Sequence, residues 1–220
     1  MPQIKAVVFD SDGTLMDSVG IIVGAYTYVA EQYGYPAPTE ADILEQLRWS
    51  HPLGQILQTF FPATPLEDLL QTNSDYILRN AALASAFVGI RELLTALQER
   101  GLKLAIVTGG GHKIHDQMRH HGLDGFFTSI VHSERVSLSK PDPEGFRLAL
   151  QECDVQPTEA VMVGDSPNDI LAGKRGDAAA TIGICHGHAT RADLQAADAD
   201  YVVPDVAGLQ KLLFKLTDQS

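Results

Sequence analysis

Two aspartates separated by one residue, Asp10 and Asp12, are the side chains of this sequence best suited to chemistry. They directly follow an apolar segment, residues 4–9, that predicts a buried strand. Carboxylates held this close repel each other and resist ionising together unless a cation or hydrogen bonds offset their charge. Gly13 allows a sharp turn after them, and carboxylate oxygens suit a hard cation such as Mg2+. The pattern indicates a nucleophile, a proton shuttle and a metal acting on a phosphate group.

The same D-x-D-G pattern also occurs in calcium-binding loops and in plain solvated turns. An EF-hand loop needs a third oxygen ligand and a closing Glu, whereas Leu15 and Met16 are apolar where such a loop stays polar. A capped turn after an edge strand is compatible with the segment taken alone. The choice therefore depends on what the rest of the chain places beside the two acids.

Composition limits the class of protein and its partners. The 220 residues can form one large domain, or a core with a small second domain. A formal net charge of -12 argues against nucleic acid or an anionic membrane as the main partner. Cys153 and Cys185 lack metal-ligand spacing and are expected to be small buried hydrophobic residues. Neither a signal-peptide pattern nor a membrane-length apolar run is evident, so we expect a cytoplasmic protein.

Strand and helix patterns alternate along the chain from residue 87 onwards. After the first strand, further strands are predicted at 102–107, 128–131, 160–164, 180–184 and 201–203, and helices at about 90–101, 112–121, 143–153 and 167–176. This alternation predicts an α/β fold, a Rossmann-like parallel sheet with helices on both faces.

Residues 16–86 have a different character. A helix is predicted at 19–33, ended by Gly34, and further helical stretches are interrupted by prolines, with no strand expected. The segment reads as a small all-α cap domain inserted after the first strand. We therefore expect a catalytic core of residues 1–15 and 87–220, with the cap formed by 16–86.

Polar residues recur where the predicted strands end. Asp10 follows the first strand, Thr108 follows 102–107 and Asp165 follows 160–164, while Lys140 lies in the loop after 128–131. In open α/β sheets ligands bind beyond the carboxyl ends of the strands, so these groups are expected to converge. A nucleophile, a hydroxyl, an ammonium group and further acids are what phosphoryl transfer through an aspartyl intermediate requires.

Each of these residues also has a plainer interpretation. Thr108 could cap the following helix, and Lys140 alone would be a solvated loop residue. Asp165 and Asp169 could be a helix N-cap and a first-turn acid. Capping explains one acid well, but not the repeated placement of acids at strand ends.

With these residues in this order, the chain resembles phosphatases of the haloacid dehalogenase superfamily, in the branch with a helical cap after the first motif. The stretch DSDGTL matches the first motif, Thr108 the second, Lys140-Pro141 the third and GDSPND the fourth. Asp17-Ser18 and the form KPDP further resemble the phosphoglycolate phosphatase-like group. A departure from the family pattern is the run of three glycines after Thr108, where relatives often carry Asn or Ser.

The resemblance implies a role for each acid. Asp10 would be the nucleophile that forms a phospho-aspartate. Asp12 would be the general acid and base, and its backbone carbonyl would also contact the metal. Asp165 would bind Mg2+ directly, and Asp169 would support the ion. The metal set implied by the resemblance is therefore Asp10, Asp12, Asp165 and Asp169.

The resemblance likewise implies the groups that hold the substrate. Thr108 and the amide of Gly109 would bind the phosphoryl oxygens, and Lys140 would neutralise charge on the phosphate and the nucleophile. In the cap, Arg48 could bind a substrate carboxylate or a second phosphate, although a plain surface arginine is the simpler interpretation.

Six histidines gather in two segments, a predicted helix and the loop after 180–184: His112, His115, His120, His121, His186 and His188. A metal site is conceivable, but a solvated helix face and a surface loop are the favoured interpretations. Because the loop after 180–184 follows a strand, its two histidines, His186 and His188, could still line the mouth of the site.

The function expected from these features is Mg2+-dependent hydrolysis of a small-metabolite phosphomonoester resembling phosphoglycolate. A sugar-phosphate mutase, a pyrophosphatase and a nucleotide phosphatase on the same fold remain open alternatives. A receiver-like phosphoacceptor is disfavoured because no accepting Asp follows the strand that precedes Thr108. We expect a small phosphorylated metabolite as partner, without nucleic acid or membrane, and leave monomer and homodimer open.

Overall fold

A six-stranded sheet of parallel strands forms the centre of the computed structural model, which describes residues 3–48, 53–80 and 84–218. The spatial order is β5-β4-β1-β6-β7-β8, so the first strand lies in the middle. The strands are β1 (Ala6–Phe9), β4 (Lys103–Val107), β5 (Ser129–Val131), β6 (Ala160–Gly164), β7 (Ala180–Ile184) and β8 (Tyr201–Val203). The predicted α/β fold with a parallel sheet is confirmed.

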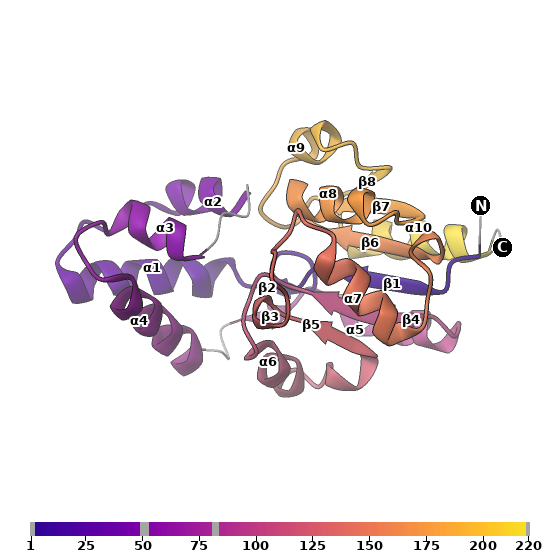
Figure 1. Ribbon diagram of the computed structural model, residues 1–220, viewed down its shortest axis with the longest axis horizontal. Helices are drawn as coiled ribbons and strands as arrows, with labels where there is room; N and C mark the ends of the chain where they lie inside the picture. Colours follow the sequence, from indigo (N-terminus) through magenta and orange to yellow (C-terminus); the bar gives the residue numbers. More distant parts are fainter. Residues whose placement is uncertain (1–2, 49–52, 81–83, 219–220) are drawn as a thin grey trace.

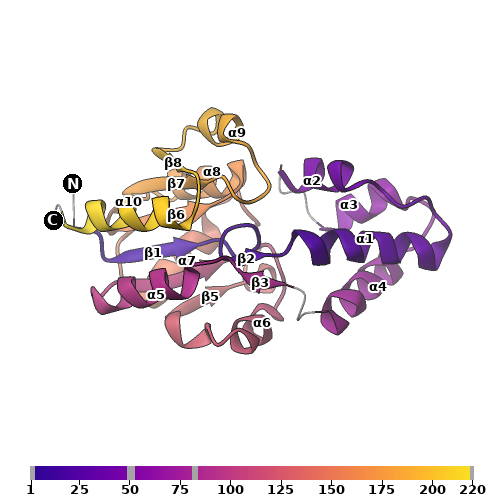
Figure 2. The same ribbon diagram turned by 180° about the vertical axis from the view of Figure 1, so that it is seen from behind.

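Helices cover both faces of this sheet (Figures 1 and 2). On one face lie α7 (Glu144–Cys153) and α8 (Pro167–Arg175), and on the other lie α5 (Ile90–Glu99) and α10 (Val206–Asp218). Successive residues of β1 alternate between the two layers, because side chains along a strand point to opposite faces. Ala6 and Val8 pack under α7, whereas Val7 and Phe9 belong to the cluster beneath α5 and α10.

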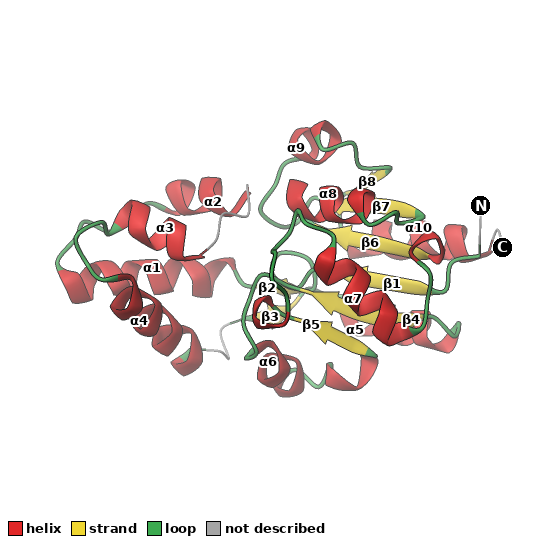
Figure 3. Ribbon diagram, in the orientation of Figure 1, coloured by secondary structure: helices red, strands yellow, loops and turns green. Residues whose placement is uncertain are grey.

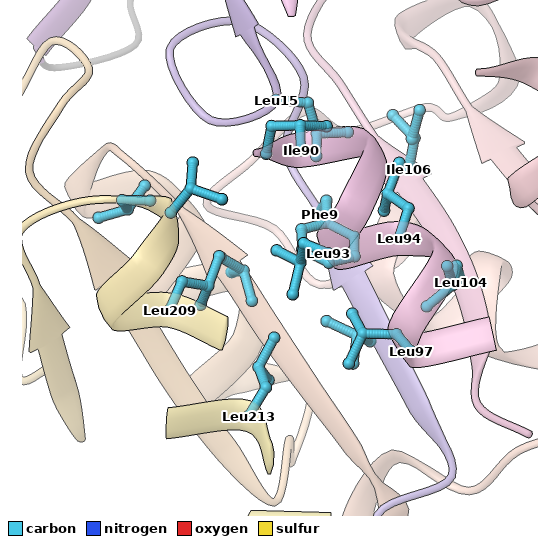
Figure 4. Close-up of a cluster of buried hydrophobic side chains, with 14 of the residues drawn as sticks. Phe9, Leu15, Ile90, Leu93, Leu94, Leu97, Leu104, Ile106, Leu209 and Leu213 are labelled. Atoms are coloured by element: carbon cyan, nitrogen blue, oxygen red, sulfur yellow. The ribbon is translucent and has the colours of Figure 1, made fainter. Parts of the chain in front are cut away.

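The cluster beneath α5 is built from apolar residues at helical spacing. Ile90, Leu93, Leu94 and Leu97 recur every three or four positions, which places them on one face of α5. Figure 4 shows them packed against Phe9 of β1, Leu104 and Ile106 of β4, and Leu209 and Leu213 of α10. This layer supports β1 and therefore the loop that carries the two aspartates.

Truncating one of these side chains should destabilise the whole core. Leu93 is fully buried, so Leu93→Ala is expected to lower the free energy of unfolding by about 2–5 kcal/mol. Leu138 is 57% exposed, and Leu138→Ala should change it by less than about 0.5 kcal/mol. Urea unfolding of the two variants makes the comparison, and equal losses would contradict the placement of Leu93 in the core.

Four helices form a separate unit beyond the carboxyl ends of the strands, which we call the cap (Figure 3). They pack around a core of their own that includes Tyr26, Ile43, Leu57, Phe61 and Leu69. The chain termini lie at the opposite end of the molecule (Figure 1). The cap helices are α1 (Val19–Tyr33), α2 (Glu40–Arg48), α3 (Leu53–Phe60) and α4 (Leu66–Arg79).

A short antiparallel ribbon, β2 (Met16–Asp17) and β3 (Ser85–Ala86), joins the cap to the core. The expectation that the inserted segment holds no strand is wrong at this point, because a two-residue strand is too short to show an alternating pattern. The division into a core of 1–15 and 87–220 and a cap of 16–86 stays a prediction about domains.

In the described part of the core, two α-helices remain to be named: α6 (Ile114–His120) lies beside β5, and α9 (Arg191–Ala196) packs against α8, β7 and β8. Neither α9 nor α10 was among the predicted elements. The signal for α10 is the spacing of Val206, Leu209, Leu213 and Leu216, all of them buried. None of the helices in the described ranges is both long enough and apolar enough to cross a membrane.

Candidate active site

The carboxyl ends of three adjacent strands deliver the polar residues to one place. Asp10 follows the central strand β1, Thr108 follows its neighbour β4, and Asp165 follows β6 on the other side. Lys140 reaches the same place from the loop between β5 and α7, where its Nζ contacts Asp10. The four residues therefore lie together, as expected, at the edge of the sheet that faces the cap.

An acid cluster lies at this edge. One carboxylate oxygen from each of Asp10, Asp165 and Asp169 lies within 4.8 Å of the other two, and all three residues are buried. Asp169 is held by a capping box at the start of α8: the backbone N and the Oγ of Ser166 donate to its Oδ2 at 3.0 and 2.6 Å. Asp169 is therefore a first-turn acid of α8, as the capping interpretation expected. Its second carboxylate oxygen, Oδ1, faces the acid cluster.

Lys140 bridges two of the three acids. Its Nζ lies 2.6 Å from Oδ1 of Asp10 and 2.6 Å from Oδ1 of Asp169, and it also donates to the Val107 carbonyl at 3.2 Å. The side chains of Lys140, Asp10 and Asp169 are only 10%, 10% and 1% exposed. Burial alone would lower the pKa of Lys140, but the two carboxylates outweigh it and hold the pKa above its ordinary value. Lys140 therefore stays charged.

The two aspartates of the first motif have raised pKa values. Burial raises the pKa of Asp10 well above its ordinary value, and the charges of Asp169 and Asp165 add to this effect against the opposing pull of Lys140. Burial also raises the pKa of Asp12. A raised pKa favours the protonated carboxyl that a general acid needs, whereas Asp10 needs additional positive charge nearby to act as an anion.

Asp165 is held by the loop after β1 and by the loop after β7. The Thr14 Oγ1 donates to its Oδ1 at 3.2 Å, and the backbone N of His188 donates to its Oδ2 at 2.7 Å. The His188 imidazole Nδ1 lies 2.8 Å from that same oxygen. Burial would raise the pKa of Asp165, but the contacts with His188 outweigh it and lower the pKa. Asp165 is therefore oriented and ionised.

His188 is a residue of this site that the sequence interpretation placed on a surface loop. The favoured surface-loop interpretation is wrong for His188, because its side chain is 7% exposed and lines the same cavity as Asp10 and Asp12. The alternative, in which the histidines of this loop line the site, is the one that His188 fits. The available signal is its position after β7, at the same edge of the sheet as the acids. The histidines of the predicted helix at 112–121 were expected on a solvated face, and His112, His115 and His120 are exposed.

Gly13 permits the close approach of the first loop to Asp165. Its φ of +78° is a conformation that glycine adopts readily, and a Cβ built at this position would lie 2.3 Å from Oδ2 of Asp165. Any larger residue would thus push the two acid-bearing loops apart.

Thr108 is buried at the end of β4, and its Oγ1 accepts a hydrogen bond from the backbone N of Gly110 at 3.0 Å. Thr108 does not cap α6, which begins six residues later at Ile114. Thr108 and the three glycines that follow line the cavity above the acid cluster. Backbone amides of such a glycine loop, together with the hydroxyl, suit an oxygen-rich anion.

A cavity of about 1300 Å³ separates the acid cluster from the cap. Its floor includes Asp10, Asp12 and Lys140, and its far wall is made by α1, α3 and α4 of the cap. Arg48 does not line it among the described residues: its Nε lies 3.5 Å from Oδ2 of Asp193, on α9 of the core. Substrate binding by Arg48 therefore stays a prediction. In the structure, its ion pair with Asp193 connects the cap to the core.

The acid cluster fits a hard divalent cation. Three buried carboxylates face one ammonium group, so negative charge is left in excess, and oxygen-only donors are those that Mg2+ prefers. Asp10, Asp165 and Asp169 are the side chains that would hold the ion. The contact expected from the backbone carbonyl of Asp12 stays a prediction.

Comparison with known protein families matches residues 7–182 to the haloacid dehalogenase-like hydrolases. The chain belongs to this family. The match includes β1 with its two aspartates, the cap and the loops that carry Thr108, Lys140 and Asp165. The resemblance drawn from the four short motifs is confirmed.

Individual relatives of this haloacid dehalogenase-like hydrolase cover between 78% and 98% of the chain. A phosphoglycolate phosphatase of Vibrio vulnificus is 30% identical over 94% of this chain and 95% of its own. A pyrophosphatase PpaX of Bacillus pumilus is 34% identical over 78% of this chain and 79% of its own. A haloacid dehalogenase-like family protein of Streptococcus pneumoniae superimposes with a TM-score of 0.85 at 26% identity, covering 98% of this chain and 100% of its own.

Proposed function

We propose that this hydrolase is a Mg2+-dependent phosphatase that cleaves a small phosphomonoester through a phosphorylated Asp10. The observation that carries the proposal is the meeting of Asp10, Asp12 and Lys140 on the floor of a cavity beneath the cap. Relatives named phosphoglycolate phosphatase and pyrophosphatase support the cleavage of phosphate esters or anhydrides. Mg2+, when bound, would neutralise the acid cluster and favour the approach of an anionic phosphate.

Two steps balance the reaction. First, a carboxylate oxygen of Asp10 attacks phosphorus, the P–O ester bond breaks, and Asp12 gives its proton to the departing alcohol oxygen. The raised pKa of Asp12 supports its protonated form at this stage. Then water attacks the phosphorus of the phospho-aspartate, its proton passes to Asp12, and inorganic phosphate leaves. Both carboxyl groups end as they began.

Charge stabilisation during both steps comes from groups that are already in place. Lys140 lies beside Asp10, so its ammonium group is close to the phosphoryl group being transferred. Thr108 and the Gly109 amide lie along the same cavity and would bind the phosphoryl oxygens. Because these groups would be positioned by the fold rather than by the substrate, little reorganisation would be needed during the reaction.

Phosphate release from a panel of esters tests this proposal. With phosphoglycolate, benzyl phosphate, glucose 6-phosphate and pyrophosphate, we expect release in Mg2+ and a loss of at least ~10²-fold in EDTA, because the metal supplies several kcal/mol of charge stabilisation. Restoring Mg2+ should restore the rate, which controls for irreversible damage. The absence of metal-dependent release from every compound would overturn the proposal. Isomerisation of a sugar phosphate with a bisphosphate primer would then favour the mutase.

A further inference from the structure

The cap side of the cavity is mainly aliphatic, with a polar strip on α4 that consists of Glu67, Gln71, Asn73 and Ser74. The residues that α1, α3 and α4 present to it include Ile22, Leu53, Ile56, Leu66, Leu70 and Ile77. The opposite wall holds the acid cluster and Lys140. A phosphate ester bound with its phosphate on Lys140 would therefore direct its organic part against aliphatic side chains, where burying apolar surface is favourable.

Cationic side chains are almost absent from this cavity. Among the described residues that line it, Lys140 is the only Lys or Arg, and it already contacts Asp10 and Asp169. The acids that line it are Asp10, Asp12, Glu67, Glu134 and Asp165. His188 also lines the cavity, but its imidazole contacts Asp165. Within the described lining, a second anionic group on the substrate would thus face carboxylates, neutral side chains and aliphatic carbon, and no Lys or Arg would be available to pair with it.

The cap sequence offers few cations that could turn inward. Residues 16–86 contain two arginines and no lysine, and the segments outside the described ranges, 49–52 and 81–83, contain neither type. Arg48 pairs with Asp193 of the core, and Arg79 is exposed at the end of α4. From the core, Lys113 donates its Nζ to Ser74 Oγ at 2.6 Å and does not itself line the cavity.

These observations restrict the class of substrate. We propose, building on the phosphatase function above, that the natural substrate is a phosphate monoester of a neutral and largely apolar alcohol. A compound with a second anion, such as phosphoglycolate or pyrophosphate, would place that charge opposite carboxylates and aliphatic carbon, which is unfavourable. The cavity of this chain therefore selects against the compounds for which its relatives are named.

Rates on matched esters test the substrate class separately from the phosphatase function. Benzyl phosphate and phosphoglycolate both release an alkoxide, but only the second carries a carboxylate. We expect kcat/KM for benzyl phosphate to exceed that for phosphoglycolate and for pyrophosphate by at least ~10-fold, as expected for rejection of one unpaired charge. A preference for phosphoglycolate or pyrophosphate would overturn this inference and leave the phosphatase intact. No release from any of the three or from glucose 6-phosphate would overturn the phosphatase itself.

Two charge reversals on neighbouring residues of α4 locate the effect. Glu67 lines the cavity, whereas Asp68 is exposed on the same first turn and does not line it. Glu67→Lys should raise the ratio of kcat/KM for phosphoglycolate to that for benzyl phosphate by ~3–10-fold, because a carboxylate is replaced by an ammonium near the bound anion. Asp68→Lys makes the same change in charge and should leave the ratio within twofold. Equal ratios in the two variants would contradict an electrostatic selection by the cavity wall, and thermal unfolding of both checks that they are folded.

Discussion

Replacing Asp10 with Asn is expected to reduce phosphate release by at least ~10³-fold, the scale of loss seen when a covalent nucleophile is removed. The amide keeps the size of the side chain but offers no anionic oxygen to phosphorus. Asp124→Asn is a suitable control, because Asp124 is exposed and far along the chain from the cluster. The measurement is steady-state phosphate release at saturating Mg2+. Retention of more than a tenth of the rate would exclude Asp10 as the nucleophile.

The same variant should not lose stability. The raised pKa of Asp10 means that the folded state disfavours its charged form at neutral pH when no metal is bound. Asn removes that charge, so in EDTA the melting temperature is expected to equal or exceed that of the unmodified chain. The increase in melting temperature on adding Mg2+ should become smaller, because one of the three carboxylates is gone. A variant that is both inactive and unfolded would not support the assignment, and Asp10→Ser would then be the second replacement to measure.

Lys140→Met should cause the largest loss of stability among the site variants, about 3–5 kcal/mol in EDTA. The ammonium group lies between the carboxylates of Asp10 and Asp169, and its removal leaves two buried charges without a partner. Lys174 provides the matched control: it contacts Asp200 at 2.6 Å with its side chain 32% exposed. Lys174→Met should cost about 0–1 kcal/mol, as exposed ion pairs contribute little. Urea unfolding at neutral pH gives both values.

The pH dependence of the Lys140 effect follows from Asp10. Without the ammonium group the pKa of Asp10 in the folded state rises further, so the folded protein binds a proton more readily than the unfolded chain. Lowering the pH through that raised pKa should therefore recover stability in Lys140→Met relative to the unmodified chain, until Asp10 also protonates in the unfolded chain near pH ~4. A stability difference that stays constant between pH 7 and 5 would contradict a charge-based origin. Phosphate release should fall ~10²–10³-fold in the variant, as for loss of a charge-stabilising donor.

Much of the core and its acid cluster could be predicted from the sequence because both depend on local patterns. Strands such as β6 and helices such as α5 have apolar residues at the spacing of their own secondary structure. The position of Asp10, Thr108 and Asp165 after three strands then places them together through a general property of parallel sheets. Lys140 could be added because it lies in the loop that follows the predicted strand at 128–131, and its motif then supported its role.

The parts that could not be predicted depend on contacts between distant segments. His188 contacts Asp165 because two loops 23 positions apart meet. Its position after a strand allowed it to line the site, but the local sequence did not identify Asp165 as its partner. The pairing of Arg48 with Asp193 joins cap to core across 145 positions, so the sequence pattern around Arg48 carries no trace of it. The apolar residues on the cap side of the cavity likewise resemble ordinary helix core in the sequence.

The short ribbon of β2 and β3 has a consequence for how such proteins change over time. Met16 pairs directly with Ala86, so the chain leaves the core and returns to it at neighbouring points. A segment inserted in this way can be lengthened, shortened or exchanged while the ends it presents to the sheet stay in the same place. Such changes between Met16 and Ala86 would leave the stretches that carry Asp10, Lys140 and Asp165 unaltered.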